Sequence, residues 1–100
     1  MKNPEELLEL SLEKIRKIKK LEGQFIVQRH YEQGPLPIQK CTILSVYYKK
    51  GDKVNLLYRW RACVAGDNIQ MSNEEAYVET LASLILNWEE IWNSINTKPQ

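Results

Sequence analysis

The stretch from residue 40 to residue 64, KCTILSVYYKKGDKVNLLYRWRACV, decides the fold. It holds two runs rich in β-branched and aromatic residues, one on each side of Gly51-Asp52. A two-residue turn with glycine at its first central position joins such runs into a β-hairpin. The sequence therefore predicts a long antiparallel hairpin that places Lys50 opposite Lys53.

An uninterrupted register from this turn assigns every side chain of the hairpin to one face of the sheet. The face turned to the core is expected to carry the pairs Cys41 and Ala62, Ile43 and Trp60, Ser45 and Tyr58, and Tyr47 and Leu56. The opposite face is then expected to carry Lys40, Thr42, Leu44, Val46, Tyr48, Leu57, Arg59 and Arg61. Cys41 and Cys63 fall on opposite faces, so we expect two buried thiols in a reducing compartment and no disulfide between them.

Helical patterns flank the hairpin. Asn3-Pro4 is typical of a helix start, because asparagine caps and proline suits the first helical position. An apolar stripe with helical spacing follows, and Gly23 is a natural stop: Leu7, Leu8, Leu12, Ile15, Ile18 and Leu21. A strand over 24–31 and a loop over 32–37 lead into the hairpin.

A second helix is expected to follow a loop around Gly66-Asp67-Asn68. Ser72 and Glu75 have the spacing of a capping box, which predicts a helix from about Asn73 to Ile95. One apolar row of this helix consists of Tyr77, Leu81, Leu84, Trp88, Ile91 and Ile95. A second row, which needs the first helix or another subunit as its partner, consists of Val78, Ala82, Ile85 and Trp92.

These elements predict an α+β fold with the order α-β-β-β-α. We expect a single domain over residues 1–100, built as a two-layer sandwich. Its three-stranded antiparallel sheet is expected to carry the N-terminal and C-terminal helices on one face.

Composition and motifs argue against several classes of function. The net charge of +1 lacks the strongly basic signature of many nucleic-acid-binding domains. The chain has no apolar run of about 20 residues and an acidic N-terminus, so we expect a cytoplasmic protein without membrane attachment. Two cysteines and the lone His30 form no zinc pattern, and no catalytic motif is present. We expect no enzyme activity, no cofactor and no small-molecule substrate.

The leading hypothesis is a small interaction or accessory protein that binds a protein partner and forms a homodimer. The outer sheet face is half apolar and half basic, which is unusual for a face that only meets solvent. Trp88 and Trp92 lie one turn apart, a spacing that fits either a core or a helix-mediated interface. The candidate partner-binding residues are Leu44, Tyr48, Leu57, Arg59, Arg61, Trp88 and Trp92.

The alternative is a nucleic-acid-binding module. The end of the first helix is rich in lysine, and two arginines flank Trp60 on the last strand, where they suit phosphate contact or base stacking. A solvated helix face is the other interpretation of the lysines. The candidate nucleic-acid-binding residues are Lys17, Lys20, Arg59 and Arg61.

The element order resembles the double-stranded-RNA-binding domain. Gly34-Pro35 is similar to that family's loop between its first two strands, and the run from Gly66 to Leu84 to its loop into the last helix. The resemblance implies that family's fold and duplex RNA as a ligand. The chain departs from the family at Pro37, where a histidine is expected. It departs again where Asn73, Glu74 and Glu75 stand in place of the family's lysines, because acids there would repel phosphate.

Overall fold

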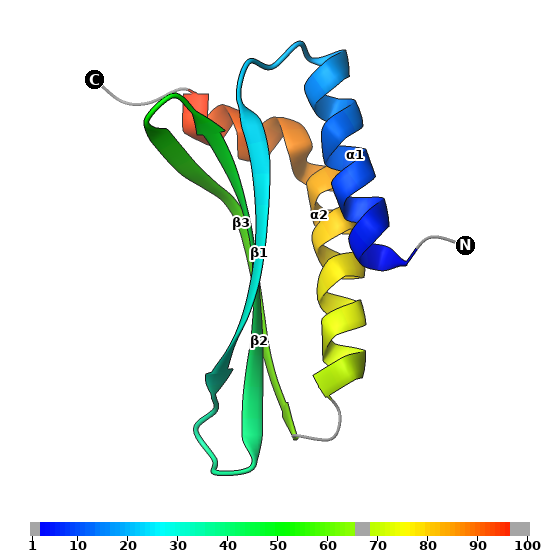
Figure 1. Cartoon of the computed structure of the whole chain (residues 1–100), viewed down its shortest axis with the longest axis vertical. Helices are drawn as coiled ribbons and strands as arrows, with labels where there is room; N and C mark the ends of the chain where they lie inside the picture. The colour runs from blue at the N-terminus through cyan, green and yellow to red at the C-terminus, as the bar shows by residue number, and fades with distance from the viewer. Residues whose placement is uncertain (1–2, 66–68, 97–100) are drawn as a thin grey trace.

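Two helices and three strands follow one another in the order α-β-β-β-α (Figure 1). The computed structural model describes residues 3–65 and 69–96. The elements are α1 (Pro4–Ile18), β1 (Gln24–Gln33), β2 (Gln39–Lys50), β3 (Lys53–Ala65) and α2 (Ile69–Asn96). The strands form one antiparallel sheet in the order β1-β2-β3. The predicted α+β architecture is confirmed.

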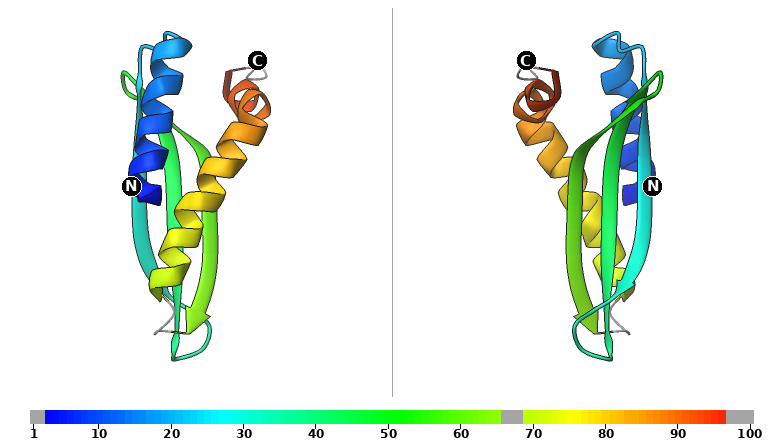
Figure 2. Two further views of the ribbon diagram at one scale, coloured as in Figure 1. Left: turned by 90° about the vertical axis from the view of Figure 1, so that its right-hand side faces the viewer. Right: turned by 90° about the vertical axis from the view of Figure 1, so that its left-hand side faces the viewer.

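Both helices lie on the same face of the sheet, as the two side views in Figure 2 show. One view has the helices in front of the strands, and the opposite view has the strands in front of the helices. Within residues 3–65 and 69–96, no helix or strand covers the second face of the sheet.

The start of α1 is as predicted, and its end is not. The Asn3 side chain accepts a hydrogen bond of 2.9 Å from the Glu6 N–H, and Pro4 occupies the first turn. The helix ends at Ile18, five residues before Gly23, because Lys20 adopts a left-handed φ of 54°. The Leu21 N–H then reaches the Arg16 carbonyl at 3.0 Å, which satisfies the last turn.

The hairpin turn is confirmed, but the register beyond it contains a β-bulge. Gly51 has a φ of 60°, and Lys50 lies opposite Lys53. Tyr47 still pairs with Leu56, whereas the next residue of β2, Val46, pairs with Tyr58. Leu57 is thus the extra residue of the bulge, and every later pair is shifted by one position.

The shift overturns the predicted faces of β2. The pairs beyond the bulge include Leu44 with Trp60, and these side chains lie in the core beneath the helices. Four apolar residues assigned to the outer face belong to this core: Leu44, Val46, Tyr48 and Leu57. The physical reason is that a one-residue slip moves a strand's side chains to the opposite face.

The predicted pair of buried thiols is also wrong. Cys41 lies opposite Cys63, with the Cα atoms 3.9 Å apart, and the two residues form a disulfide between β2 and β3. The uninterrupted register separates these residues, and the bulge brings them together. Closing a chain segment with a sequence separation of 22 stabilises a protein by about 3 kcal/mol in the chain-entropy description.

The second helix begins earlier than its sequence signal indicates. It starts at Ile69, so Ser72 lies inside α2 and does not cap it. The Ser72 hydroxyl is buried without a hydrogen-bond partner among the described residues, so the predicted capping box is absent. The expected loop at residues 66–68 lies outside the described part of the chain.

A kink divides α2. Asn87 has non-helical dihedral angles, φ −118° and ψ 18°. Figure 1 shows the last turns crossing behind the upper end of the sheet, toward the β2–β3 turn. No helix within the described residues is long and apolar enough to cross a membrane.

An aromatic cluster fills the space beneath the last part of α2. Trp88 and Trp92 stack with ring centroids 5.3 Å apart. Trp92 meets the Tyr48 ring edge-on at 5.0 Å, and Phe25 of β1 meets Trp88 at 5.9 Å. The Tyr48 hydroxyl accepts a hydrogen bond of 2.7 Å from the Gly23 N–H. A Cβ at Gly23 would lie 2.3 Å from the Lys49 carbonyl oxygen, so this position excludes any side chain.

The bulge can be tested with two leucine truncations. Leu44 is fully buried and Leu56 is 43% exposed, whereas the uninterrupted register predicts the opposite ranking. We expect Leu44→Ala to lower the free energy of unfolding by about 2–5 kcal/mol. Leu56→Ala should lower it by less than about 1 kcal/mol. Urea denaturation of the oxidised proteins measures both, and a larger loss at Leu56 would contradict the observed register.

Candidate interaction surfaces

The open sheet face is the face opposite the helices, and all three strands contribute to it. The pairing places on this face Ile26, His30, Ile43, Tyr47, Leu56, Arg59 and Arg61. Arg59 and Arg61 are exposed, whereas Ile26 and Tyr47 are only partly exposed. The face thus combines a partly buried apolar floor with exposed cationic groups.

Two neighbouring side chains hold Arg59. Its Nε donates a hydrogen bond of 3.2 Å to the Ser45 hydroxyl directly opposite on β2. A hydrogen bond with Arg59 also lowers the pKa of Tyr47, and one with Ser45 acts in the same direction. Burial has the contrary but smaller effect on that pKa. The guanidinium is thereby held beside an aromatic ring on the open sheet face.

Arg61 lies above the disulfide. Its Nη2 is 3.6 Å from the Cys41 sulfur, a distance that fits a weak N–H to sulfur contact. On the opposite edge strand, His30 Nε2 lies 3.5 Å from the Glu32 carboxylate, and both side chains are about half exposed. The end of the open sheet face that carries the disulfide is therefore lined by the polar side chains of Arg61, His30 and Glu32.

The structure brings together only part of the predicted partner-binding set. Arg59 and Arg61 lie on the open sheet face, as the sequence indicated. The three predicted apolar members of that face, Leu44, Tyr48 and Leu57, are buried beneath the helices and do not line it. Of the two interpretations of Trp88 and Trp92, the structure favours the core, because both rings pack in the aromatic cluster.

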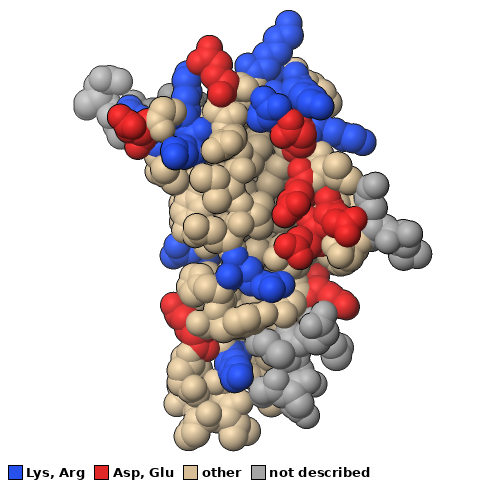
Figure 3. Space-filling view, viewed as in Figure 1, with Lys and Arg blue, Asp and Glu red and all other residues tan. Residues whose placement is uncertain are grey.

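The predicted nucleic-acid-binding residues are split between two layers. Lys17 lies in the last turn of α1 and Lys20 just after it, in the helix layer, whereas Arg59 and Arg61 lie on the open sheet face. Figure 3 shows acidic side chains gathered over the N-terminal half of α1 and basic ones near its C-terminal end. The lysines and the arginines do not form a continuous patch.

Sequence reasoning missed Tyr47 and Ile26 as members of the open sheet face. Tyr47 faces away from the helices because the bulge places the alternate β2 residues Leu44 and Val46 in the core. Ile26 shares the face of Tyr47 because the two residues pair across β1 and β2. The adjacent pair Leu56-Leu57 interrupts the alternation of the strand, and the two cysteines fit one another only in the shifted register. These two signals together point to the extra residue.

A second exposed apolar surface lies on α2. The α2 apolar row consists of Val78, Ala82 and Ile85, spaced by four and three residues so that they share one side of the helix. Val78 is 53% exposed and Ile85 is 60% exposed. The fourth predicted member, Trp92, packs inward. The first helix does not cover this row.

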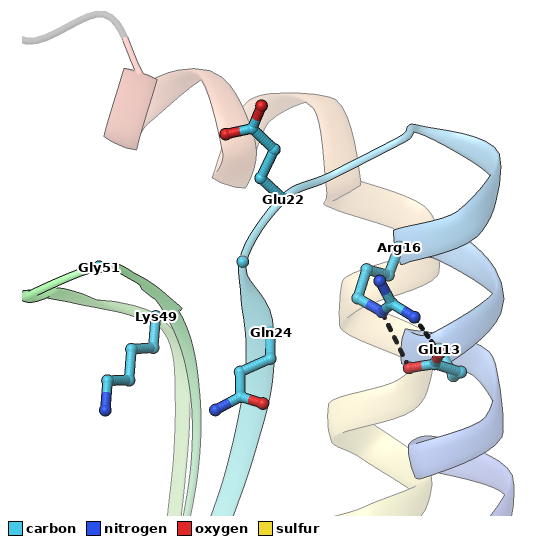
Figure 4. A pocket seen from close by; sticks show the side chains of 7 residues that line it. Glu13, Arg16, Glu22, Gln24, Lys49 and Gly51 are labelled. Carbon is cyan, nitrogen blue, oxygen red and sulfur yellow. Dashed lines mark hydrogen bonds and ion pairs between the residues drawn. The ribbon is translucent and has the colours of Figure 1, made fainter.

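A polar hollow of about 460 Å³ lies between α1, the start of β1 and the hairpin turn. Figure 4 shows that its charged groups do not converge. Glu13 and Arg16 pair with each other on α1, which lowers the pKa of Glu13 and raises that of Arg16. The Lys49 side chain points away from α1. The hollow lacks the convergent groups of a built catalytic or ligand site.

Within the described ranges, no group of three or more His, Cys, Asp or Glu side chains is placed to hold a metal ion. Comparisons with protein-family models, with curated proteins and with solved structures found no match. The resemblance to the double-stranded-RNA-binding domain therefore rests on the element order and the short motifs given above.

The environment of Tyr47 predicts an early titration. The folded protein should lose the Tyr47 phenol proton at a lower pH than ordinary tyrosine, and Arg59→Gln should move this step upward. Because folding lowers this pKa, deprotonation of Tyr47 raises the free energy of unfolding only as the pH rises past the folded-state pKa. The effect contributes nothing at neutral pH. Tyrosinate absorbance measures the step, with Tyr47→Phe to assign it.

Arg61→Gln is the control for this titration, because Arg61 contacts Cys41 and is not one of the groups that shift the Tyr47 pKa. An equal shift in both arginine variants would show that general charge, and not the hydrogen bond, sets the Tyr47 pKa.

Proposed function

We propose that this protein is a small non-catalytic interaction module that binds a protein partner through the open sheet face. The observation that carries the proposal is the uncovered face itself, on which Arg59 and Arg61 stand over partly buried apolar side chains. Hot spots of protein interfaces are rich in arginine and tyrosine, and Tyr47 lies beside Arg59.

The charges of the open sheet face favour an acidic partner surface. Arg59 and Arg61 are two exposed cations that pair with no carboxylate among the ion pairs of the described residues. Glu32 is the acidic group of this face and lies beside His30. A planar guanidinium binds a carboxylate through two parallel hydrogen bonds, which adds geometric specificity.

We further propose a homodimer in which the α2 apolar row meets the same row of a second copy. An isologous contact of this kind needs only one self-complementary patch. The row lies on the helix layer, so a dimer built on it leaves the open sheet face free for the other partner.

The second candidate function is binding of single-stranded nucleic acid on the open sheet face. Tyr47 beside Arg59 favours it, because aromatic rings stack on bases and arginine contacts phosphate. The duplex-RNA surface of the resembling family is less suitable here. Glu74 and Glu75 are exposed near the start of α2, where that family carries lysines.

A cytoplasmic location stays a prediction. Disulfides are rare in cytosolic proteins and, where present, are usually transient. A cytoplasmic location therefore implies that the disulfide between Cys41 and Cys63 is transient, that is, reduced and re-formed.

Charge reversal on the open sheet face tests partner binding. We expect Arg59→Glu with Arg61→Glu to reduce the recovery of partner about tenfold or more, because arginines at interface centres contribute 1–2 kcal/mol or more each. The measurement is affinity purification from the source cells with and without nuclease. Lys17→Glu with Lys20→Glu is the matched control and should leave recovery unchanged.

Nuclease separates the two candidate functions in this experiment. Recovery that survives nuclease supports a protein partner, and recovery lost with nuclease supports nucleic acid. Equal recovery by the sheet variant and the wild type would refute the open sheet face as the binding surface for either class.

The dimer has its own test. Val78→Glu with Ile85→Glu should convert the protein to a monomer, because charges in an apolar contact are desolvated without partners. Light scattering across a wide concentration range gives the mass. Leu36→Glu, at an exposed leucine of the β1–β2 loop, is the control and should remain dimeric. A wild-type protein that is monomeric throughout would exclude this contact.

A further inference from the structure

The two cysteines of the disulfide differ in accessibility. Cys41 lies in the central strand and is fully buried, whereas Cys63 lies in the edge strand β3 and is partly exposed. A thiolate that attacks a disulfide must approach one sulfur, and access decides which one. The geometry therefore directs an incoming thiolate to Cys63 and makes Cys41 the leaving sulfur.

A cation stands beside the leaving sulfur. Arg61 Nη2 lies 3.6 Å from Cys41 Sγ, so its charge would stabilise a thiolate there. Glu32 is the β1 partner of Cys41, and its carboxylate lies 3.5 Å from His30 Nε2. Exchange is faster when the leaving thiolate is better stabilised.

The strands stay paired without the covalent bond. The ladder between β2 and β3 continues on both sides of the cysteines, from Gln39 opposite Ala65 to Lys50 opposite Lys53. The adjoining residue Thr42 donates a hydrogen bond of 3.2 Å to Asn73 of α2, which ties this end of the sheet to the helix. Reduction therefore leaves the two thiols facing each other, ready to re-form the bond.

We propose that Cys41–Cys63 is a reversible thiol–disulfide exchange site for a dithiol reductant. A reductant thiolate attacks Cys63 Sγ and forms a mixed disulfide. The Sγ–Sγ bond breaks, and its electron pair leaves on Cys41 as a thiolate beside Arg61. The second thiol of the reductant then attacks the reductant sulfur of the mixed disulfide and releases Cys63 as a thiolate. The reductant becomes a disulfide, the protein gains two electrons, and the protons of the two reductant thiols go to the two cysteines.

The test of leaving-group stabilisation uses the native protein and dithiothreitol without denaturant. Alkylation followed by intact-mass measurement gives the rate of reduction. We expect complete reduction with the near-ultraviolet circular dichroism largely retained. Arg61→Gln should slow the reaction about threefold or more, and Arg61→Lys should recover part of the rate. Lys49→Gln, which removes a positive charge from the opposite end of β2, the strand of Cys41, should react like the wild type.

A second measurement tests the direction of attack in the wild-type protein and needs no variant. Limited exposure to reduced glutathione, acid quenching and peptide mapping locate the mixed disulfide. Glutathione on Cys63 supports the proposal, and glutathione on Cys41 overturns it. Reduction that occurs only in denaturant, or equal rates for Arg61→Gln and Lys49→Gln, would also overturn it.

Discussion

One extra residue in β3 determines which side chains the helices cover. The bulge at Leu57 lets residues 47–50 of β2 keep their partners near the turn, while residues 39–46 change partners. Leu44 and Tyr48 then face α1 and α2, and the two cysteines come opposite one another. The core, the disulfide and the cationic open sheet face all depend on this single interruption of the ladder.

The sequence predicted features that depend on local chemistry. Asn3-Pro4 marks a helix start and Gly51-Asp52 a tight turn whatever surrounds them, so both were found. The bulge was not predicted, because the register was extended without interruption from the turn, and the turn does not determine the ladder beyond an extra residue. Arg59 and Arg61 were nevertheless placed correctly. They lie beyond the bulge on β3, where the predicted and observed faces agree, whereas all of β2 was inverted.

Polar contacts as well as apolar packing attach the first half of α2 to the sheet. Asn73 donates a hydrogen bond of 2.8 Å to the Tyr31 hydroxyl of β1, and the Trp60 indole donates to the Glu79 carboxylate. Ser83 donates to the Tyr58 hydroxyl at 3.2 Å. Such contacts are directional, so they fix the rotation of α2 about its axis. That rotation turns the α2 apolar row outward and turns the Ser72 hydroxyl inward, where it is buried.

The sheet order β1-β2-β3 leaves the outer edges of β1 and β3 without a neighbouring strand among the described residues. Unpaired edges invite strands from other molecules, which is a route to aggregation. A bulge bends and twists its strand, and that makes the edge a poor template for a straight incoming strand. The residue that sets the core of this protein thus also helps to keep separate copies from joining into an extended sheet. A shortened β3 without Leu57 would lose both properties at once.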